Sequence, residues 1–225
     1  MTRPSRELDV SPQRLRHIRW IGGGSGAGKS TVARLLAANH GLRLYSTDDM
    51  QSAHAARSNP ADHPLLHAFL AMTMDERWAK RTPEEMFRTF HGFHGEGFEL
   101  LLGDLLDLPT DLPILVEGYK LLPRLVAPLL SRPNQAVWLI PTPEFRRTAL
   151  ASRGSTWSIA GRTSDPETAL ANLCQKRQRD GSIISLKTYG MGSVEVFVLN
   201  VTRASSMSCT ACSAPELVGN RYHHS

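Results

Sequence analysis

Short apolar runs alternate with segments of helical periodicity along most of the chain, and this alternation predicts an α/β fold. The runs that we interpret as strands are Arg16–Ile21, Leu42–Ser46, Pro113–Gly118, Gln135–Ile140 and Val194–Asn200. The pattern therefore predicts an open sheet whose strands alternate with helices.

The first predicted helix, Thr31–His40, follows the first strand closely. Its apolar residues Val32, Leu35 and Leu36 fall at helical spacing, and Gly41 stands where a helix is expected to stop. Strand, glycine-rich turn and helix therefore follow one another at the start of the chain.

Residues 50–110 contain no strand pattern, so we expect a helical insertion between the second and third strands. One helix is predicted over Asp62–Met72. A second begins at Thr82, with Pro83 in its first turn and Glu85 three residues after the cap, the arrangement of a capping box. This second helix can continue to residue 108 unless the glycines at 92, 95 and 97 break or bend it.

A chain of 225 residues is long enough for one large domain with a substantial core. We expect a flexible N-terminal segment over 1–15, a core domain over 16–200 and an irregular or disordered tail over 201–225. Within the core domain, we predict that residues 50–110 form an insertion that binds the acceptor of a transferred group and that residues 144–165 form a lid over the binding site.

Composition and charge narrow the function classes. The formal net charge of +5 suits a polyanionic ligand, but no basic stripe with interleaved aromatic residues points to nucleic acid. No run approaches the ~18 apolar residues that span a membrane, and the polar N-terminus lacks the apolar centre of a secretory signal. We therefore expect a cytoplasmic protein without nucleic-acid or membrane partners. The pair Cys209 and Cys212 has no second metal-ligand pair and is interpreted as incidental.

The stretch from Gly22 to Thr31 contains Gly23-x-x-x-x-Gly28-Lys29-Ser30, the pattern of a phosphate-binding P-loop. Glycines let the backbone curl so that successive N–H groups point at a polyphosphate, and the following helix adds its positive end. Lys29 can reach the β- and γ-phosphates, and the Ser30 hydroxyl can bind Mg²⁺. The predicted nucleotide-binding residues here are Gly23, Gly24, Ser25, Gly26, Ala27, Gly28, Lys29, Ser30 and Thr31.

Acidic residues follow two of the predicted strands. Asp48 and Asp49 come directly after the second strand, and ligands of open α/β sheets bind beyond the carboxyl ends of strands. We favour Asp48 as the catalytic carboxylate and expect both to contact the substrate, although either could simply cap the next helix. Glu117 ends the third strand and is predicted to hold Mg²⁺ and to lie beside the substrate; an ordinary strand-end turn is the alternative.

Basic residues in two segments are candidates for binding the acceptor and the phosphates. In the insertion we single out Arg77 and Trp78 for substrate binding, and the candidates beside them are Lys80, Arg81 and Arg88. After the fourth strand, Arg147 is predicted to contact the nucleotide and Arg153 to stabilise charge in transfer. A solvated helix face is the alternative for each. His91 and His94 suggest a surface or pocket position more than a metal site, because glycines interrupt the segment that carries them.

With these residues placed, the chain resembles the P-loop small-molecule and nucleoside or nucleotide kinases, a group that includes uridine, gluconate, shikimate and adenylate-type kinases. The resemblance covers roughly residues 16–180 and rests on Gly23–Thr31, on the strand that ends in Glu117-Gly118, on the position of Asp48-Asp49 and on the basic segment of residues 146–162. It implies a P-loop three-layer sandwich whose five-stranded parallel sheet has the order 2-3-1-4-5.

The resemblance implies an enzyme that uses ATP and Mg²⁺ to phosphorylate a small molecule, at a hydroxyl of a nucleoside, sugar or similar metabolite. Lys29, Asp48 and Arg153 would be its catalytic residues, and Ser30 with Glu117 would hold the metal. The alternatives are a nucleoside monophosphate kinase, a phosphotransferase that modifies a toxin or antibiotic, and a regulatory NTP-binding switch that hydrolyses slowly. The acceptor and the oligomeric state are not predicted by the sequence.

Overall fold

A five-stranded parallel sheet organises the fold, with the strand order β2-β3-β1-β4-β5 that the sequence resemblance implied. The computed structural model describes residues 9–142, 145, 149, 155–189 and 195–199. The strands are β1 (Ile18–Gly23), β2 (Arg43–Ser46), β3 (Ile114–Glu117), β4 (Ala136–Pro141) and β5 (Glu195–Leu199). All neighbouring pairs are parallel. The predicted strands are confirmed to within two residues at each end.

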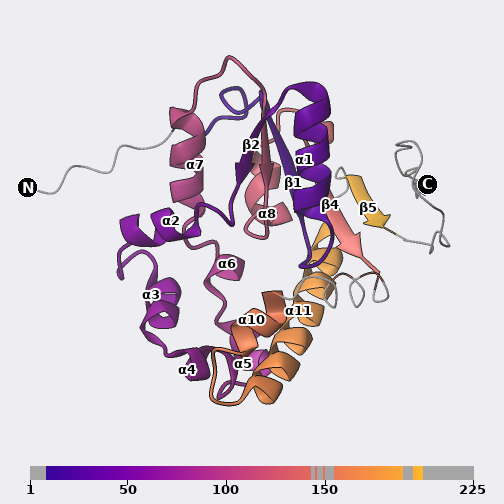
Figure 1. The fold of residues 1–225 in the computed structure, drawn as a ribbon. Helices are drawn as coiled ribbons and strands as arrows, with labels where there is room; N and C mark the ends of the chain where they lie inside the picture. Colours follow the sequence, from indigo (N-terminus) through magenta and orange to yellow (C-terminus); the bar gives the residue numbers. More distant parts are fainter. Residues whose placement is uncertain (1–8, 143–144, 146–148, 150–154, 190–194, 200–225) are drawn as a thin grey trace, which may run out of the picture.

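Helices cover both faces of the sheet and extend beyond its carboxyl edge (Figure 1). In chain order they are α1 (Lys29–His40), α2 (Gln51–Arg57), α3 (Pro64–Ala71), α4 (Met74–Trp78), α5 (Pro83–Arg88), α6 (His91–His94), α7 (Phe98–Asp107), α8 (Pro123–Val126), α10 (Ser155–Ala160) and α11 (Pro166–Tyr189), with the short 3₁₀ helices Ala127–Leu129 and Pro133–Gln135. None of the described helices combines the length and the apolarity that a bilayer crossing requires.

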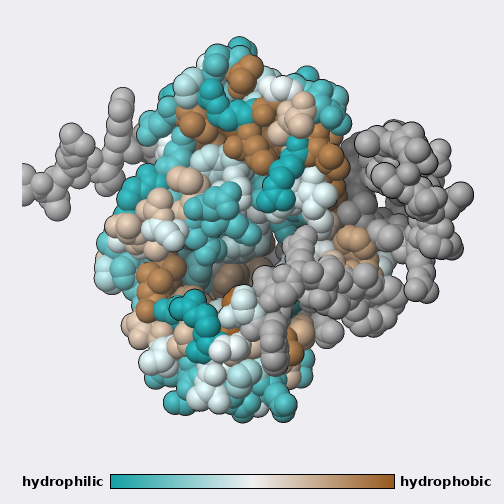
Figure 2. All heavy atoms as spheres, in the orientation of Figure 1, coloured by the Kyte–Doolittle hydropathy of each residue, from teal (hydrophilic) through white to brown (hydrophobic). Residues whose placement is uncertain are grey.

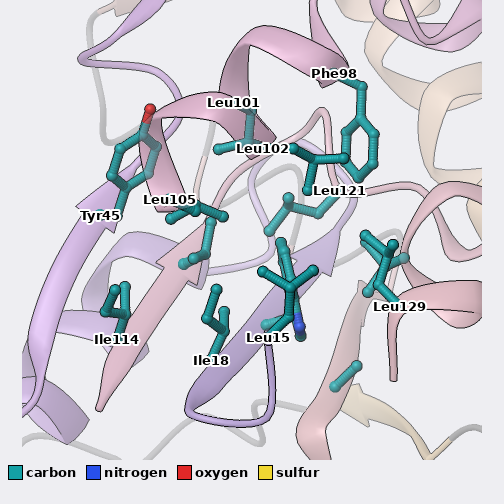
Figure 3. Packing of buried hydrophobic residues seen from close by; sticks show 14 of the residues in the cluster. Leu15, Ile18, Tyr45, Phe98, Leu101, Leu102, Leu105, Ile114, Leu121 and Leu129 are labelled. Atoms are coloured by element: carbon teal, nitrogen blue, oxygen red, sulfur yellow. The ribbon is translucent and has the colours of Figure 1, made fainter. Parts of the chain in front are cut away.

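Side chains alternate between the two faces of the sheet, and each face has its own apolar core. On one face Ile18 and Trp20 of β1 join Ile114 and Val116 of β3, and Leu101 of α7 packs against them (Figure 3). On the other face a smaller core lies beneath α1; its buried residues are Ile21, Ala27, Ala33, Leu115 and Leu139. This period of two along buried strands fixes their register, because a one-residue slip would exchange the two faces.

Helix α1 has the expected position and ends where it was expected to end, and its buried face is centred on Ala33. Gly41 adopts the left-handed conformation, and its N–H donates to Ala37 O, which ends the helix as predicted. The apolar pair Leu35 and Leu36 is 55% and 37% exposed, however, and the helix packs on the sheet through Ala33. The small side chain at residue 33 lets the helix backbone lie close to β1 and β3, so the helical spacing of Leu35 and Leu36 does not mark the buried face.

The insertion between β2 and β3 consists of six short helices, α2 to α7. The helix that begins after Thr82 ends at Arg88, and α7 begins only at Phe98. Gly95 and Gly97 separate them with φ angles of 85° and 78°, a left-handed backbone that a continuous helix excludes. The glycines therefore break the helix, the outcome that the sequence left open.

The packed part of the chain begins before residue 16. Leu15 is fully buried in the larger core, and a turn over residues 11–15 leads into β1. The expected flexible segment of residues 1–15 therefore includes at least one core residue.

Candidate active site

The loop between β1 and α1 has the curled backbone that the P-loop pattern predicts. Gly26 and Gly28 have φ angles of 78° and 77°, which favour glycine. Gly24 N donates to Leu139 O of β4 at 3.1 Å, so the start of the loop is fixed to the neighbouring strand. Gly23 is confined more tightly still, because a Cβ there would lie 2.1 Å from Leu139 O. Its glycine is a requirement of the fold as well as of the motif.

Lys29 begins α1 with its side chain turned back over the loop. The residue is 9% exposed, and its ammonium donates to Gly24 O at 2.9 Å. This places the charge inside the curl of the loop, where β- and γ-phosphates of a nucleotide would bind. Ser30 follows in the first turn of α1, partly exposed, and lines the same space.

Asp48 lies where strand β2 ends beside β3. Thr47 N donates to Glu117 O at 2.9 Å, which continues the β2–β3 ladder to the residue before Asp48. Although the carboxyl group of Asp48 faces an open cavity, desolvation by the surrounding protein raises its pKa above the ordinary value, and the nearby charge of Lys29 opposes the shift. Asp49 is exposed and does not line the cavity.

Glu117 is buried at the carboxyl end of β3, next to a glycine that the packing requires. The residue is 2% exposed, and its Oε2 has no hydrogen-bond partner among the described residues. A Cβ at Gly118, whose φ is 151°, would lie 1.7 Å from Thr47 Oγ1. The Glu117-Gly118 pair thus lets the ends of β2 and β3 meet closely beneath the P-loop.

Lys29, Ser30 and Asp48 meet at one cavity of about 240 Å³ between the carboxyl edge of the sheet and the helices beyond it, whereas Glu117 is outside its lining. The face shown in Figure 2 is hollowed between the sheet and the helices that lie beyond its carboxyl edge. One wall is the P-loop, and the opposite wall comes from the insertion and from α10 and α11. The described lining residues are Gly23, Ser25, Gly26, Ala27, Gly28, Lys29, Ser30, Asp48, Trp78, Phe90, Phe93, Tyr119, Ile159, Leu173, Lys176 and Arg177. Gly24 and Thr31, predicted with the P-loop, are outside this lining.

Aromatic rings dominate the wall that faces the P-loop. Phe90 lies at the centre, with ring centroids 5.1 Å from Phe93 and 5.4 Å from Tyr119. Trp78 of α4 adds a fourth ring to the lining. Gly92 permits this packing, because a Cβ there would lie 2.9 Å from Tyr119 Cε2. Of these rings the sequence had indicated only Trp78.

Helix α11 supplies basic groups to the cavity. Lys176 is 6% exposed, and its ammonium lies 3.9 Å from the centroid of the Phe90 ring; Arg177 is next to it in the lining. Neither was singled out in the sequence, since no motif marks them and only the tertiary fold brings α11 to the P-loop. The predicted lid residues Arg147 and Arg153 lie outside the described residues, whereas Ile159 of α10 lines the cavity.

Arg77, predicted to bind the substrate, contacts the backbone of α3 in the structure, and its role in substrate binding stays a prediction. Its guanidinium donates to Phe69 O at 3.0 Å and to Leu70 O at 2.8 Å, so it binds backbone carbonyls in the last turn of α3. Arg77 does not line the cavity, and neither do Lys80, Arg81 or Arg88. Sequence position alone could not separate these residues from Trp78, which does line it.

The insertion is attached to α11 by polar contacts. The side-chain amide of Asn172 donates to three backbone carbonyls at and after the end of α4, at Trp78, Ala79 and Arg81, over 3.2–3.3 Å. Asp75 of α4 accepts hydrogen bonds from the backbone and hydroxyl of Ser164 at 2.7 and 2.6 Å. Helices α4 and α11 are therefore held together next to the aromatic wall.

The residues present fit a magnesium ion better than a transition metal. No cluster of three or more His, Cys, Asp or Glu side chains suited to a metal occurs within the described part of the chain, and His94 contacts Arg88 O instead. A hydroxyl at Ser30 and a buried carboxylate at Glu117 with an unpaired oxygen match the oxygen ligands of Mg²⁺, which keeps several of its waters.

Comparison with known proteins gives structural neighbours only. No family model matches the chain, and no curated protein matches it by sequence. Similar solved structures include TT1252 from Thermus thermophilus (19% identity, 82% of this chain and 89% of that one, TM-score 0.42), shikimate kinase from Acinetobacter baumannii (15%, 85% and 87%, 0.38) and thymidylate kinase from Candida albicans (15%, 82% and 84%, 0.40). At these identities and TM-scores the function has to be argued from the site itself.

Proposed function

We propose that the protein is an ATP- and Mg²⁺-dependent kinase that transfers the γ-phosphoryl group to a hydroxyl of a small molecule. The observation that carries the proposal is the single cavity in which a P-loop with its lysine, an aspartate after β2 and an aromatic wall face one another. A nucleotide and an acceptor bound there would be adjacent, with Asp48 between them.

In the proposed reaction, the acceptor oxygen forms a bond to the γ-phosphorus while the bond from that phosphorus to the β,γ-bridging oxygen breaks and ADP leaves. Asp48 orients the hydroxyl and receives its proton, and its raised pKa brings it nearer to the pH at which a general base works best. Lys29 compensates the negative charge on the transferred group. Ser30 and, through water, Glu117 would hold Mg²⁺, which would supply positive charge against the charge of the phosphates.

The proposal is tested by ADP release from ATP and Mg²⁺ across a library of nucleosides, nucleotides, sugars, sugar acids and aminoglycoside-like alcohols. We expect release that depends on one acceptor class. ATP consumption that is the same without any acceptor would instead identify a hydrolytic switch and refute the kinase proposal.

Two variant pairs assign the roles. Lys29→Ala should lower acceptor-dependent turnover on the order of 10²–10³-fold, by analogy with loss of one preorganised donor, while Arg34→Ala, an exposed residue of α1, serves as the matched control. Asp48→Asn should lower turnover on the order of 10²–10⁴-fold with nucleotide binding retained. Asp49→Asn, whose carboxylate is outside the cavity lining, should have less than about a tenfold effect; the reverse order would exchange the two assignments.

A further inference from the structure

We propose that Asp104 of α7 is a positioning residue for Asp48: its carboxylate holds both ends of the turn that carries Asp48 and so fixes that side chain in the cavity. This inference rests on the proposed kinase function and adds to it a residue that lies outside the cavity lining. It follows from a cluster of buried polar side chains that the proposed reaction itself does not use.

The turn that carries Asp48 is short. Residues 47–50 join the end of β2 to the start of α2. Thr47 N donates to Glu117 O at 2.9 Å, and Gln51 N donates to Asp48 O at 3.4 Å. The place of the Asp48 side chain therefore depends on how β2 and α2 are held relative to each other.

Side chains from both sides of this turn meet at one oxygen of Asp104. Tyr45 of β2 points toward α7 (Figure 3), and its hydroxyl donates to Asp104 Oδ2 at 2.6 Å. His54 of α2 lies 2.8 Å from the same oxygen through its Nε2. A third partner, Arg57, donates to Oδ1 at 2.6 Å from an exposed position. Because Tyr45 precedes Asp48 in the chain and His54 follows it, a single carboxylate holds the turn at both ends.

The protonation states of the cluster suit this arrangement. Burial opposes ionisation of Asp104, but hydrogen bonds from its three partners hold its pKa below the ordinary value, so the carboxylate is charged at neutral pH. Burial lowers the pKa of His54, so its ring is neutral there. With Asp104 as acceptor, the ring proton lies on Nε2, and Nδ1 is a buried nitrogen without a partner among the described residues. The imidazole therefore acts as a donor to Asp104.

The cluster lies where packing alone would favour apolar side chains. Tyr45 is 8% exposed and His54 is 1% exposed, and Tyr45 belongs to the larger core together with Leu101 and Leu105 of α7. Buried polar groups destabilise a fold unless they are hydrogen-bonded, and few arrangements satisfy all of them at once. The hydrogen bonds to Asp104 therefore fix the orientation of β2 and α2 more narrowly than apolar contacts would.

A further hydrogen bond joins this turn to the cavity wall. Gln51, the first residue of α2, donates from its side-chain amide to the hydroxyl of Tyr119, which lines the cavity with Asp48. Helix α2 thus contacts Asp104 through His54 and the cavity wall through Gln51. A shift of α2 would move Asp48 relative to the P-loop, and a misplacement of about 1 Å can lower a rate on the order of 10²-fold.

Variants of Asp104 test the proposal in the full chain, with the acceptor that the library assay identifies. Asp104→Ala should lower kcat on the order of 10–10²-fold and leave the KM for ATP within ~3-fold, because the P-loop keeps its place. Asp104→Asn should recover most of the loss, since its carbonyl oxygen can still accept from both buried donors and only the exposed Arg57 loses its partner. The control is Asp107→Ala, an exposed acid at the end of the same helix, which should change kcat less than ~3-fold.

Tyr45→Phe keeps the ring in the core and removes one of the two buried hydrogen bonds, so it tests the proposal even if Asp104→Ala does not fold. We expect kcat to fall on the order of 10-fold with the KM for ATP unchanged. A kcat within ~2-fold of the wild-type value in this variant would overturn the proposal. A KM for ATP that rises as much as kcat falls would also refute it, because that result indicates a general disturbance of the fold.

Amide hydrogen exchange distinguishes failure of this inference from failure of the kinase proposal, because it needs no turnover. In Asp104→Ala, or in Tyr45→Phe if the first variant does not fold, the amides of Thr47 and Gln51 should exchange at least ~10-fold faster than in the wild type, and those of α1 should be unchanged. This result supports the inference even if no acceptor releases ADP, in which case the kinase proposal alone is refuted. Unchanged exchange at both amides overturns the inference, whatever the activity.

Discussion

His91 makes the stability of the protein depend on pH in a way that can be calculated. The ring packs against Phe90 at 5.0 Å and Phe69 at 6.2 Å between centroids, and its Nδ1 is buried without a hydrogen-bond partner among the described residues. Burial is the largest cause of its lowered pKa, about 4 instead of 6.5, and the charges of Lys120 and Lys176 add to it. The folded chain therefore binds a proton at His91 more weakly than the unfolded chain.

The difference between the folded and unfolded pKa of His91 gives the sign and the magnitude of the change in the free energy of unfolding with pH. As the pH falls below 6.5, the unfolded chain takes up a proton that the folded chain does not, so the free energy of unfolding decreases until the folded pKa of about 4 is passed. Between about pH 7.5 and about pH 5 the His91 contribution amounts to a loss of about 2 kcal/mol, and below the folded pKa it approaches about 3 kcal/mol.

The assay is urea unfolding of wild type and His91→Gln at several pH values. Because other groups titrate in both proteins, the quantity to follow is the difference between their free energies of unfolding, which should shift by about 2 kcal/mol in favour of the variant as the pH is lowered from about 7.5 to about 5. His40→Gln is the matched control, since His40 is exposed at the end of α1. A His91 difference that stays flat with pH would refute the reasoning.

Two further predictions concern residues that the site depends on without contact to substrate. Gly118→Ala should destabilise the fold by about 3 kcal/mol or more and lower Tm by roughly 6 °C or more in a thermal scan, because the new Cβ would lie 1.7 Å from Thr47 Oγ1. The control is Gly103→Ala, which should be neutral or stabilising because no atom lies within 4 Å of the added Cβ. Arg77→Ala should lower the free energy of unfolding by about 1–2 kcal/mol, because the contacts of Arg77 with the end of α3 are lost. The KM for the acceptor should stay within ~3-fold of the wild-type value. A tenfold rise in this KM would instead place Arg77 in the substrate site.

The sheet and the P-loop were predictable because local patterns determine them. Buried strands such as Ile114–Glu117 are short apolar runs, and the glycines at 23 and 28 have conformational or steric reasons that the motif encodes. The buried face of α1 was not predictable in the same way. Ala33 rather than Leu35 packs on the sheet, since the distance between helix and sheet, and not hydrophobicity alone, selects the residue that fits.

The residues of the candidate site also divide into those that local sequence patterns indicate and those that only the folded chain brings together. That Lys29 and Asp48 line the same cavity could be expected from a motif and from the position of a strand end, which the topology of open α/β sheets fixes. Lys176 and Phe90 were missed, because they belong to elements 86 positions apart in the sequence that meet only in the folded chain. Arg77 and Trp78 are neighbours in the sequence with opposite outcomes, and only the direction of each side chain on α4 separates them.

The three hydrogen bonds of Asn172 have a thermodynamic consequence. They join the end of α4 to α11, so the insertion and the helix that reaches toward the P-loop are braced as one unit. A ligand that draws this unit toward the sheet would prepare it for the second ligand, and the gain in affinity would be the same whichever of the two binds first. An amide that touches neither ligand would then set the cooperativity between them.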